Sequence, residues 1–135
     1  MTKVLIVEDD FMCRQLLMEI LKHHFDTIHM AVNGREAVDA FVHSLDEQQP
    51  YDLICLDIMM PEMDGQTALQ EIRKIEQEKG IGGINLVKVL MTTALDGAKD
   101  IMGAFVKGSC DGYLTKPINR ESLGEHLKKF KLYKN

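Results

Sequence analysis

The feature of this sequence that most constrains its fold is a series of short, largely apolar runs separated by segments with helical spacing. The clearest runs are Val4–Val7, Leu53–Leu56 and Leu86–Met91, each too short for a helix and bounded by polar or turn residues. Such runs are typical of strands that are covered on both faces. Thr27–Ala31 and Gly112–Thr115 are weaker candidates, so we expect five strands.

The segments between and after these runs keep their apolar residues on one face of a helix. They are Cys13–Leu21, Ala37–Leu45, Ala68–Ile75, Ile101–Phe105 and Leu123–Phe130. Helix start signals agree: Asn33 with Glu36 resembles a capping box, and the other candidate N-caps are Asp10, Asp64, Asp96 and Asn119. Strict alternation of strand and helix predicts an α/β fold with a parallel sheet, right-handed crossovers and helices on both faces.

Composition and charge limit the class of protein. A chain of 135 residues with 45% hydrophobic and 27% charged residues is typical of one globular domain, here residues 1–135. The net charge is -5 without a basic stripe, which argues against nucleic acid as a direct partner. Three scattered cysteines in apolar surroundings indicate reduced, buried thiols, and no apolar run is long enough to cross a membrane. We therefore expect a cytoplasmic protein that does not bind membranes.

Candidate chemistry gathers where the expected strands end, because ligands of an open parallel sheet bind beyond the carboxyl ends of its strands. Glu8 and Asp9 follow the first strand, Asp57 ends the third, Thr93 the fourth and Lys116 the fifth. Clustered carboxylates repel one another by roughly 4 kcal/mol per pair at about 4 Å, so a cation must offset them. Mg²⁺ suits oxygen ligands and phosphate. The set predicts a phosphoryl-transfer site with Asp57 as the nucleophile.

Four motifs in register carry a resemblance to a known family. They are Val4–Asp9, Leu56–Gly65, the pair Thr93-Ala94 and the string Gly112–Pro117. Together they resemble the receiver domain of bacterial response regulators, over nearly the whole chain and in the expected order. The resemblance implies a flavodoxin-like, doubly wound (βα)5 three-layer sandwich with the parallel strand order 2-1-3-4-5.

The resemblance also implies a role for each site residue. Asp57 would receive a phosphoryl group from a histidine kinase or a histidine phosphotransfer protein. Asp9, Asp57 and the main-chain carbonyl of Met59 would bind Mg²⁺ directly, with Glu8 acting through water. Lys116 and Thr93 would bind phosphoryl oxygens, and a cis Lys116–Pro117 peptide would aim the lysine.

The same resemblance predicts the output. Thr93 would move toward the phosphoryl group, and Tyr113 would turn into the space it leaves. The face formed by helix four, strand five and helix five would then change its affinity for an output protein, which the sequence does not identify. Family members place groups that line the path of the hydrolytic water at the positions of Met59 and Leu95, and neither side chain can orient water. We therefore expect slow loss of the phosphoryl group.

Alternative interpretations remain for individual residues and for the whole chain. Asp10 is better explained as a helix cap than as a ligand, and a partly buried tyrosine on an edge strand explains Tyr113 almost as well as a switch. The histidines lack metal-ligand spacing. A phosphatase with an aspartate nucleophile would use similar residues, but Met59 stands where that group has a second acid. A phosphorylation-independent interaction module and a receiver fragment of a transcription factor or hybrid kinase are further alternatives.

Overall fold

The computed structural model describes residues 2–60, 62–93 and 109–135. Within these ranges one sheet is formed by five parallel strands: β1 (Lys3–Val7), β2 (Thr27–Ala31), β3 (Leu53–Asp57), β4 (Lys88–Thr93) and β5 (Gly112–Thr115). Their order is β2-β1-β3-β4-β5, so the flavodoxin-like order implied by the resemblance is confirmed. The reversal of strand order between β1 and β3 places a ligand-binding crevice at the carboxyl ends of these strands.

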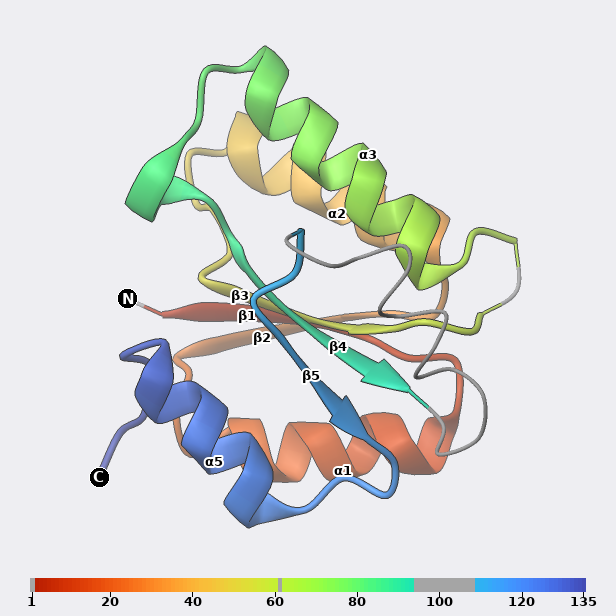
Figure 1. Ribbon diagram of the computed structural model, residues 1–135, viewed down its shortest axis with the longest axis vertical. Coiled ribbons are helices and arrows are strands. Elements are labelled where there is room, and N and C mark those ends of the chain that lie inside the picture. The colour runs from red at the N-terminus through yellow and green to blue at the C-terminus, as the bar shows by residue number, and fades with distance from the viewer. Residues whose placement is uncertain (1, 61, 94–108) are drawn as a thin grey trace.

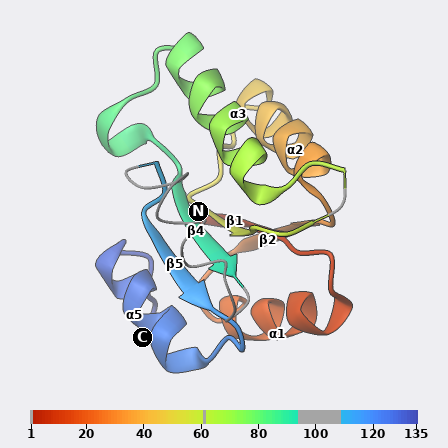
Figure 2. The same cartoon turned by 45° about the vertical axis from the view of Figure 1, so that its right-hand side comes forward.

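Helices cover both faces of the sheet (Figures 1 and 2). The helices α2 (Gly34–Asp46) and α3 (Gly65–Glu78) lie side by side on one face, and α1 (Phe11–Leu21) and α5 (Arg120–Lys129) lie on the other. The expected helix around Ile101–Phe105 and its cap Asp96 lie outside the described residues. None of the described helices is long and apolar enough to cross a bilayer.

Two apolar clusters, one on each side of the sheet, form the core. The cluster toward α2 and α3 contains Leu5, Leu56 and Met91, whereas the cluster toward α1 and α5 contains Ile6 and Leu90. All five residues of β1 and of β3 are buried, which is why these strands have continuous apolar sequences. The core therefore fixes the strand register and, with it, the residues that follow each strand.

Side-chain caps set where the helices begin, as the sequence predicts. The side chains of Asp10, Asn33, Asp64 and Asn119 each accept a hydrogen bond from a backbone N–H three residues later. The capping box differs in one detail, because the Glu36 carboxylate accepts from the N–H of Val32, not from that of Asn33. These caps determine the direction of the chain as it leaves each strand.

Two sequence expectations need correction. The strand expected over Leu86–Met91 is observed two residues later, because a short 3-10 helix (Gly83–Asn85) precedes it and the Glu76 carboxylate binds the N–H of Val87. The expectation of buried thiols holds for Cys55, whereas Cys13 and Cys110 are half-buried; all three are free.

Candidate phosphoryl-transfer site

Three acids meet at the carboxyl edge of the sheet. Glu8 and Asp9 follow β1, Asp57 ends β3, and one carboxylate oxygen from each lies within 4.8 Å of the others. Glu8 is 0% exposed and Asp57 3%, whereas Asp9 faces solvent. Burial of two neighbouring carboxylates is unfavourable without a compensating positive charge. The distances between these oxygens confirm that the three acids converge as expected.

Lys116 supplies such a charge in this structure. Its Nζ lies 2.9 Å from Oε1 of Glu8 and 3.3 Å from Oδ2 of Asp57. The backbone places it there, since the Lys116 N–H donates to the carbonyl of Thr93 at 2.7 Å, and the Lys116–Pro117 peptide is cis as expected. The lysine thus bridges both buried acids.

The pKa values of the two buried acids shift in opposite directions. Burial raises the pKa of Asp57 to about 7, and the hydrogen bond and negative charge of Glu8 add to that rise. Burial also raises the pKa of Glu8, but the contacts with Lys116 and Asp57 outweigh it, so its pKa is lowered. Burial lowers the pKa of Lys116, yet the two acids outweigh that effect and raise it. The lysine therefore stays charged, and Asp57 is the more easily protonated of the two buried acids.

The donor set fits a hard dication. The ligands offered by Glu8, Asp9 and Asp57 are all oxygens, the kind that Mg²⁺ prefers. In the described part of the chain, the buried Oε1 of Glu8 has no partner with hydrogen-bond geometry, although Lys116 lies at ion-pair distance. A hollow of about 480 Å³ beside Asp9 is lined by Met59, Asp64 and Gln66, among others. It leaves space next to Asp9 for a hydrated ion.

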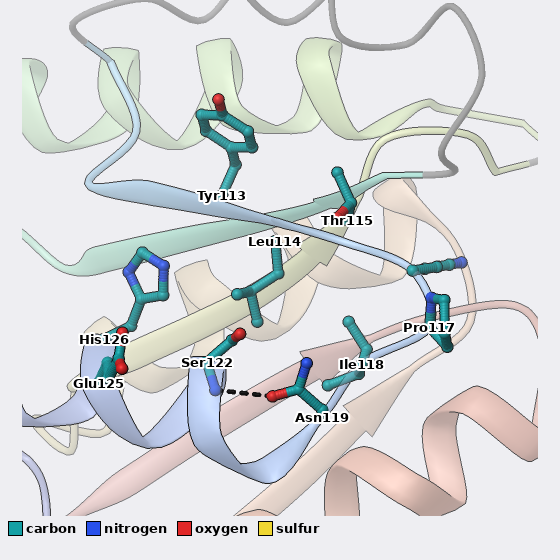
Figure 3. Close-up of a pocket in the computed structure, with 10 residues that line it drawn as sticks. Tyr113, Leu114, Thr115, Pro117, Ile118, Asn119, Ser122, Glu125 and His126 are labelled. Atoms are coloured by element: carbon teal, nitrogen blue, oxygen red, sulfur yellow. Dashed lines mark hydrogen bonds between the residues drawn. The ribbon is translucent and has the colours of Figure 1, made fainter.

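Thr93 lies on β4, the neighbour of β3, and Tyr113 lies on β5, the edge strand beyond it. Thr93 is buried at the end of β4, and the residue before it, Thr92, is the register partner of Asp57. Tyr113 is 45% exposed on the edge strand β5. Figure 3 shows its ring on the side of β5 turned away from α5, whereas His126 lies on the α5 side, in a cavity of about 350 Å³. Ala94 and Leu95 lie outside the described residues.

Sequence reasoning gave no role to two residues that shape the site. The Arg14 guanidinium donates to the main-chain carbonyl of Glu8 at 2.8 Å and holds the loop after β1. Gly65 donates its N–H to the carbonyl of Ile58 at 2.8 Å, and a Cβ on Gly65 would collide with the carbonyl of Asp57. The Asp64-Gly65 pair was a visible signal for the glycine, because such pairs mark tight turns.

Comparisons with known proteins agree with this geometry. The family model described as "Response regulator receiver domain" matches residues 4–128. The chain is 36% identical over 121 residues to the chemotaxis protein CheY of Halobacterium salinarum, covering 90% of this chain and 89% of that protein. It is also 38% identical over 124 residues to hybrid signal transduction histidine kinase I of Dictyostelium discoideum, covering 91% of this chain but 7% of the kinase.

Solved structures show the same architecture. The Mg²⁺-bound receiver domain of the histidine kinase CKI1 from Arabidopsis thaliana has a TM-score of 0.81 at 26% identity, covering 95% of this chain and 90% of that one. The receiver domain of Ssk1 from Saccharomyces cerevisiae, crystallised with the histidine phosphotransfer protein Ypd1, has a TM-score of 0.78 at 29% identity, covering 96% and 88%. The chain belongs to the response regulator receiver domain family, whose members act in two-component and phosphorelay signalling.

Proposed function

We propose that this chain is a receiver switch that accepts a phosphoryl group on Asp57 from a histidine kinase or a histidine phosphotransfer protein. The observation that carries the proposal is a buried aspartate at a strand end, 3.3 Å from a lysine and grouped with two further acids. In this role the chain is a cytoplasmic signalling domain. Its own chemistry is limited to self-phosphorylation from a donor and slow loss of the phosphoryl group.

The reaction transfers a phosphoryl group from a ring nitrogen of the donor histidine to a carboxylate oxygen of Asp57. The N–P bond breaks as the O–P bond forms, and the product is an acyl phosphate. Lys116 stands where it can bind a phosphoryl oxygen, and Thr93 supplies a hydroxyl to another. Asp9, Asp57 and the main-chain carbonyl of Met59 would hold Mg²⁺, with Glu8 acting through water. The metal would neutralise charge on the acids and on the phosphoryl oxygens.

The output follows from the added charge, about -1.5 to -2 for a phosphoryl group near neutral pH. Thr93 is drawn toward it, and Tyr113, now exposed on β5, turns inward. The face that includes β5 and α5 then presents a different surface to an output protein. The Ypd1–Ssk1 complex supports a phosphotransfer protein as a donor partner for receivers of this kind.

The direct test is incubation with acetyl phosphate and Mg²⁺, followed by intact mass. We expect one phosphoryl adduct on the wild type, none on Asp57→Asn and none when Mg²⁺ is chelated. Labelling of Asp57→Asn would redirect the assignment of the acceptor. Repeated turnover of sugar phosphates would instead support the alternative of a small-molecule phosphatase.

A matched pair of threonine variants tests the hydroxyl. Thr93→Val should slow labelling at least several-fold, because a donor to the phosphoryl group is lost. Thr92→Val makes the same change at the neighbouring buried position, whose Oγ1 has no hydrogen-bond partner among the described residues. That variant should label like the wild type. Equal effects of the two substitutions would remove the role assigned to Thr93.

A further inference from the structure

The loop between β3 and α3 connects Asp57 to the capping residue Asp64, and it carries Met59, whose carbonyl is the third proposed metal ligand. A main-chain ligand has no rotamers, so its position depends on how the loop is held. At its base the loop is closed by the Gly65 N–H, which donates to the carbonyl of Ile58. Its far side, at Glu62 and Met63, rests on another element.

That element is the beginning of α2. The N–H of Gly34, the first residue of this helix, donates to the carbonyl of Met63 at 2.9 Å. The side-chain amide of Asn33 forms two hydrogen bonds. Its Oδ1 accepts from the N–H of Glu36 at 2.8 Å, and its Nδ2 donates to Oε2 of Glu62 at 3.3 Å. The turn from β2 into α2 therefore caps its own helix and holds the loop after β3.

The contact is too close for any other residue at position 34. A Cβ on Gly34 would collide with the carbonyl oxygen of Met63. It would also lie 2.9 Å from the carbonyl carbon of Met63 and 2.9 Å from the Cγ of Met63. Glu62, next to this contact, has φ 66°, in the left-handed region that side chains other than glycine rarely adopt. The contacts at Glu62 and Met63 therefore hold this part of the loop against the beginning of α2.

We propose that Asn33 and Gly34 are positioning residues for the metal site, which fix the loop that presents the Met59 carbonyl and thereby set the affinity for Mg²⁺. The inference rests on the proposed metal-dependent function. Among the described residues, the hydrogen bonds of Asn33 and Gly34 reach the loop and not the three site acids, so both act through the loop. Groups that orient metal ligands typically change metal affinity by about 10- to 100-fold when they are lost.

The first test replaces Gly34 and compares it with a glycine in open space. Isothermal titration calorimetry with Mg²⁺ alone, at fixed pH and ionic strength, should show about tenfold weaker binding for Gly34→Ala. Gly82→Ala is the matched control, because a Cβ there meets nothing within 4 Å and its φ is -154°. It should bind Mg²⁺ like the wild type. Equal affinity of Gly34→Ala and wild type, or equal losses in both variants, would overturn the proposal.

The second test keeps the helix cap and changes only the hydrogen bond between Asn33 and Glu62. Asn33→Asp retains a capping acceptor but places a carboxylate against that of Glu62. The extra negative charge alone would attract Mg²⁺, so the several-fold weaker binding that we expect would report displacement of the loop. The double variant Asn33→Asp/Glu62→Gln exchanges donor and acceptor, and should restore affinity to within about twofold of wild type, as expected for coupled neighbours.

These outcomes separate the two proposals. Failure of the wild type to bind Mg²⁺ would refute the proposed function. Normal binding by the wild type, with no change in Asn33→Asp and no rescue in the double variant, would leave the phosphoacceptor role intact and refute the positioning role. Urea unfolding of each variant shows whether stability changes; a stability loss without a change in Mg²⁺ affinity also counts against positioning.

Discussion

Met59 stands two residues after the proposed phosphoacceptor, and 67% of its surface is exposed beside the hollow next to Asp9. A thioether is at most a weak acceptor and cannot donate a hydrogen bond. It therefore cannot hold a water molecule in line with the acyl phosphate. The side chain at this position should limit how fast the phosphoryl group is lost.

We expect Met59→Asn to shorten the lifetime of the phosphorylated form several-fold, because an amide both donates to and accepts from water. The measurement is the decay of the intact-mass adduct after the phosphodonor is removed. Met30→Asn, at an exposed position on β2, makes the same change away from the site and should leave the lifetime unaltered. A wild-type lifetime of seconds that Met59→Asn does not alter would refute this interpretation.

At the scale of single residues, the sequence indicated which side chains meet at this edge of the sheet, but not the contacts that hold them there. The convergence of Asp57 and Lys116 was predictable because one ends a strand and the other directly follows one, and parallel strands end at one edge. The contacts of Arg14, Asn33 and Gly34 were not, since each bridges segments whose spacing in three dimensions no local pattern encodes. The ion pairs of Lys116 with both buried acids likewise required coordinates.

Among the elements, α3 and β4 are joined by a partly buried polar network. Arg73 on α3 donates to Oε1 of Glu76 at 2.7 Å, to the carbonyl of Val87 at 2.9 Å and to Oδ2 of Asp111 at 3.2 Å. Glu76 is 1% exposed and also accepts from the N–H of Val87. This network ties α3 to the residues just before β4 and β5. It explains why β4 begins later than its apolar run suggests.

We expect Arg73→Met to lower the free energy of unfolding by about 3 kcal/mol, because it leaves the Glu76 carboxylate buried without its ion-pair partner. The measurement is urea unfolding followed by circular dichroism. Arg35→Met removes an exposed arginine from α2 and should change stability by less than about 0.5 kcal/mol. A loss at Arg73 no larger than the loss at Arg35 would show that Glu76 is adequately solvated without it.

The boundaries of the elements were predictable wherever a local signal was strong. Thr27–Ala31 and Gly112–Thr115 coincide with β2 and β5, and the caps Asn33 and Asn119 begin their helices as expected. The apolar run Leu86–Met91 predicted the wrong start for β4, because tertiary hydrogen bonds and not hydrophobicity decide where that strand begins. Strand order had no local signal, and came from the family resemblance.

For the molecule as a whole, stability should depend on pH through three histidines. Burial lowers the pKa values of His24, His29 and His126 below that of a free histidine. Of the three, His24 is buried; its Nδ1 accepts from the N–H of Lys134 at 3.0 Å, and its ring lies 4.5 Å from that of Tyr133. Between the lowered pKa and the ordinary value near 6.5, the unfolded chain binds more protons than the folded one. The contribution of each histidine to the stability of the fold therefore decreases as pH falls below that value.

Asp57 acts in the opposite direction over part of the same range. Its pKa is raised from 3.8 to about 7, so the folded protein binds more protons than the unfolded chain between these values. As pH falls through this window, the contribution of Asp57 to the stability of the fold increases, whereas that of the histidines decreases. A single stability curve mixes the two effects, and a difference between variants is needed to separate them.

His24→Gln supplies that difference, because glutamine can still accept from the Lys134 N–H but does not titrate. In metal-free buffer, the free energy of unfolding of the wild type should fall relative to that of His24→Gln as pH decreases from neutral through the histidine range. The neighbouring exposed His23→Gln removes a charge that helps to lower the pKa of His24, so it should reduce this fall without abolishing it. Parallel curves for the wild type and His24→Gln would show that protonation of His24 costs the fold nothing, and that the contact between the C-terminal residues and the end of α1 tolerates a charged ring.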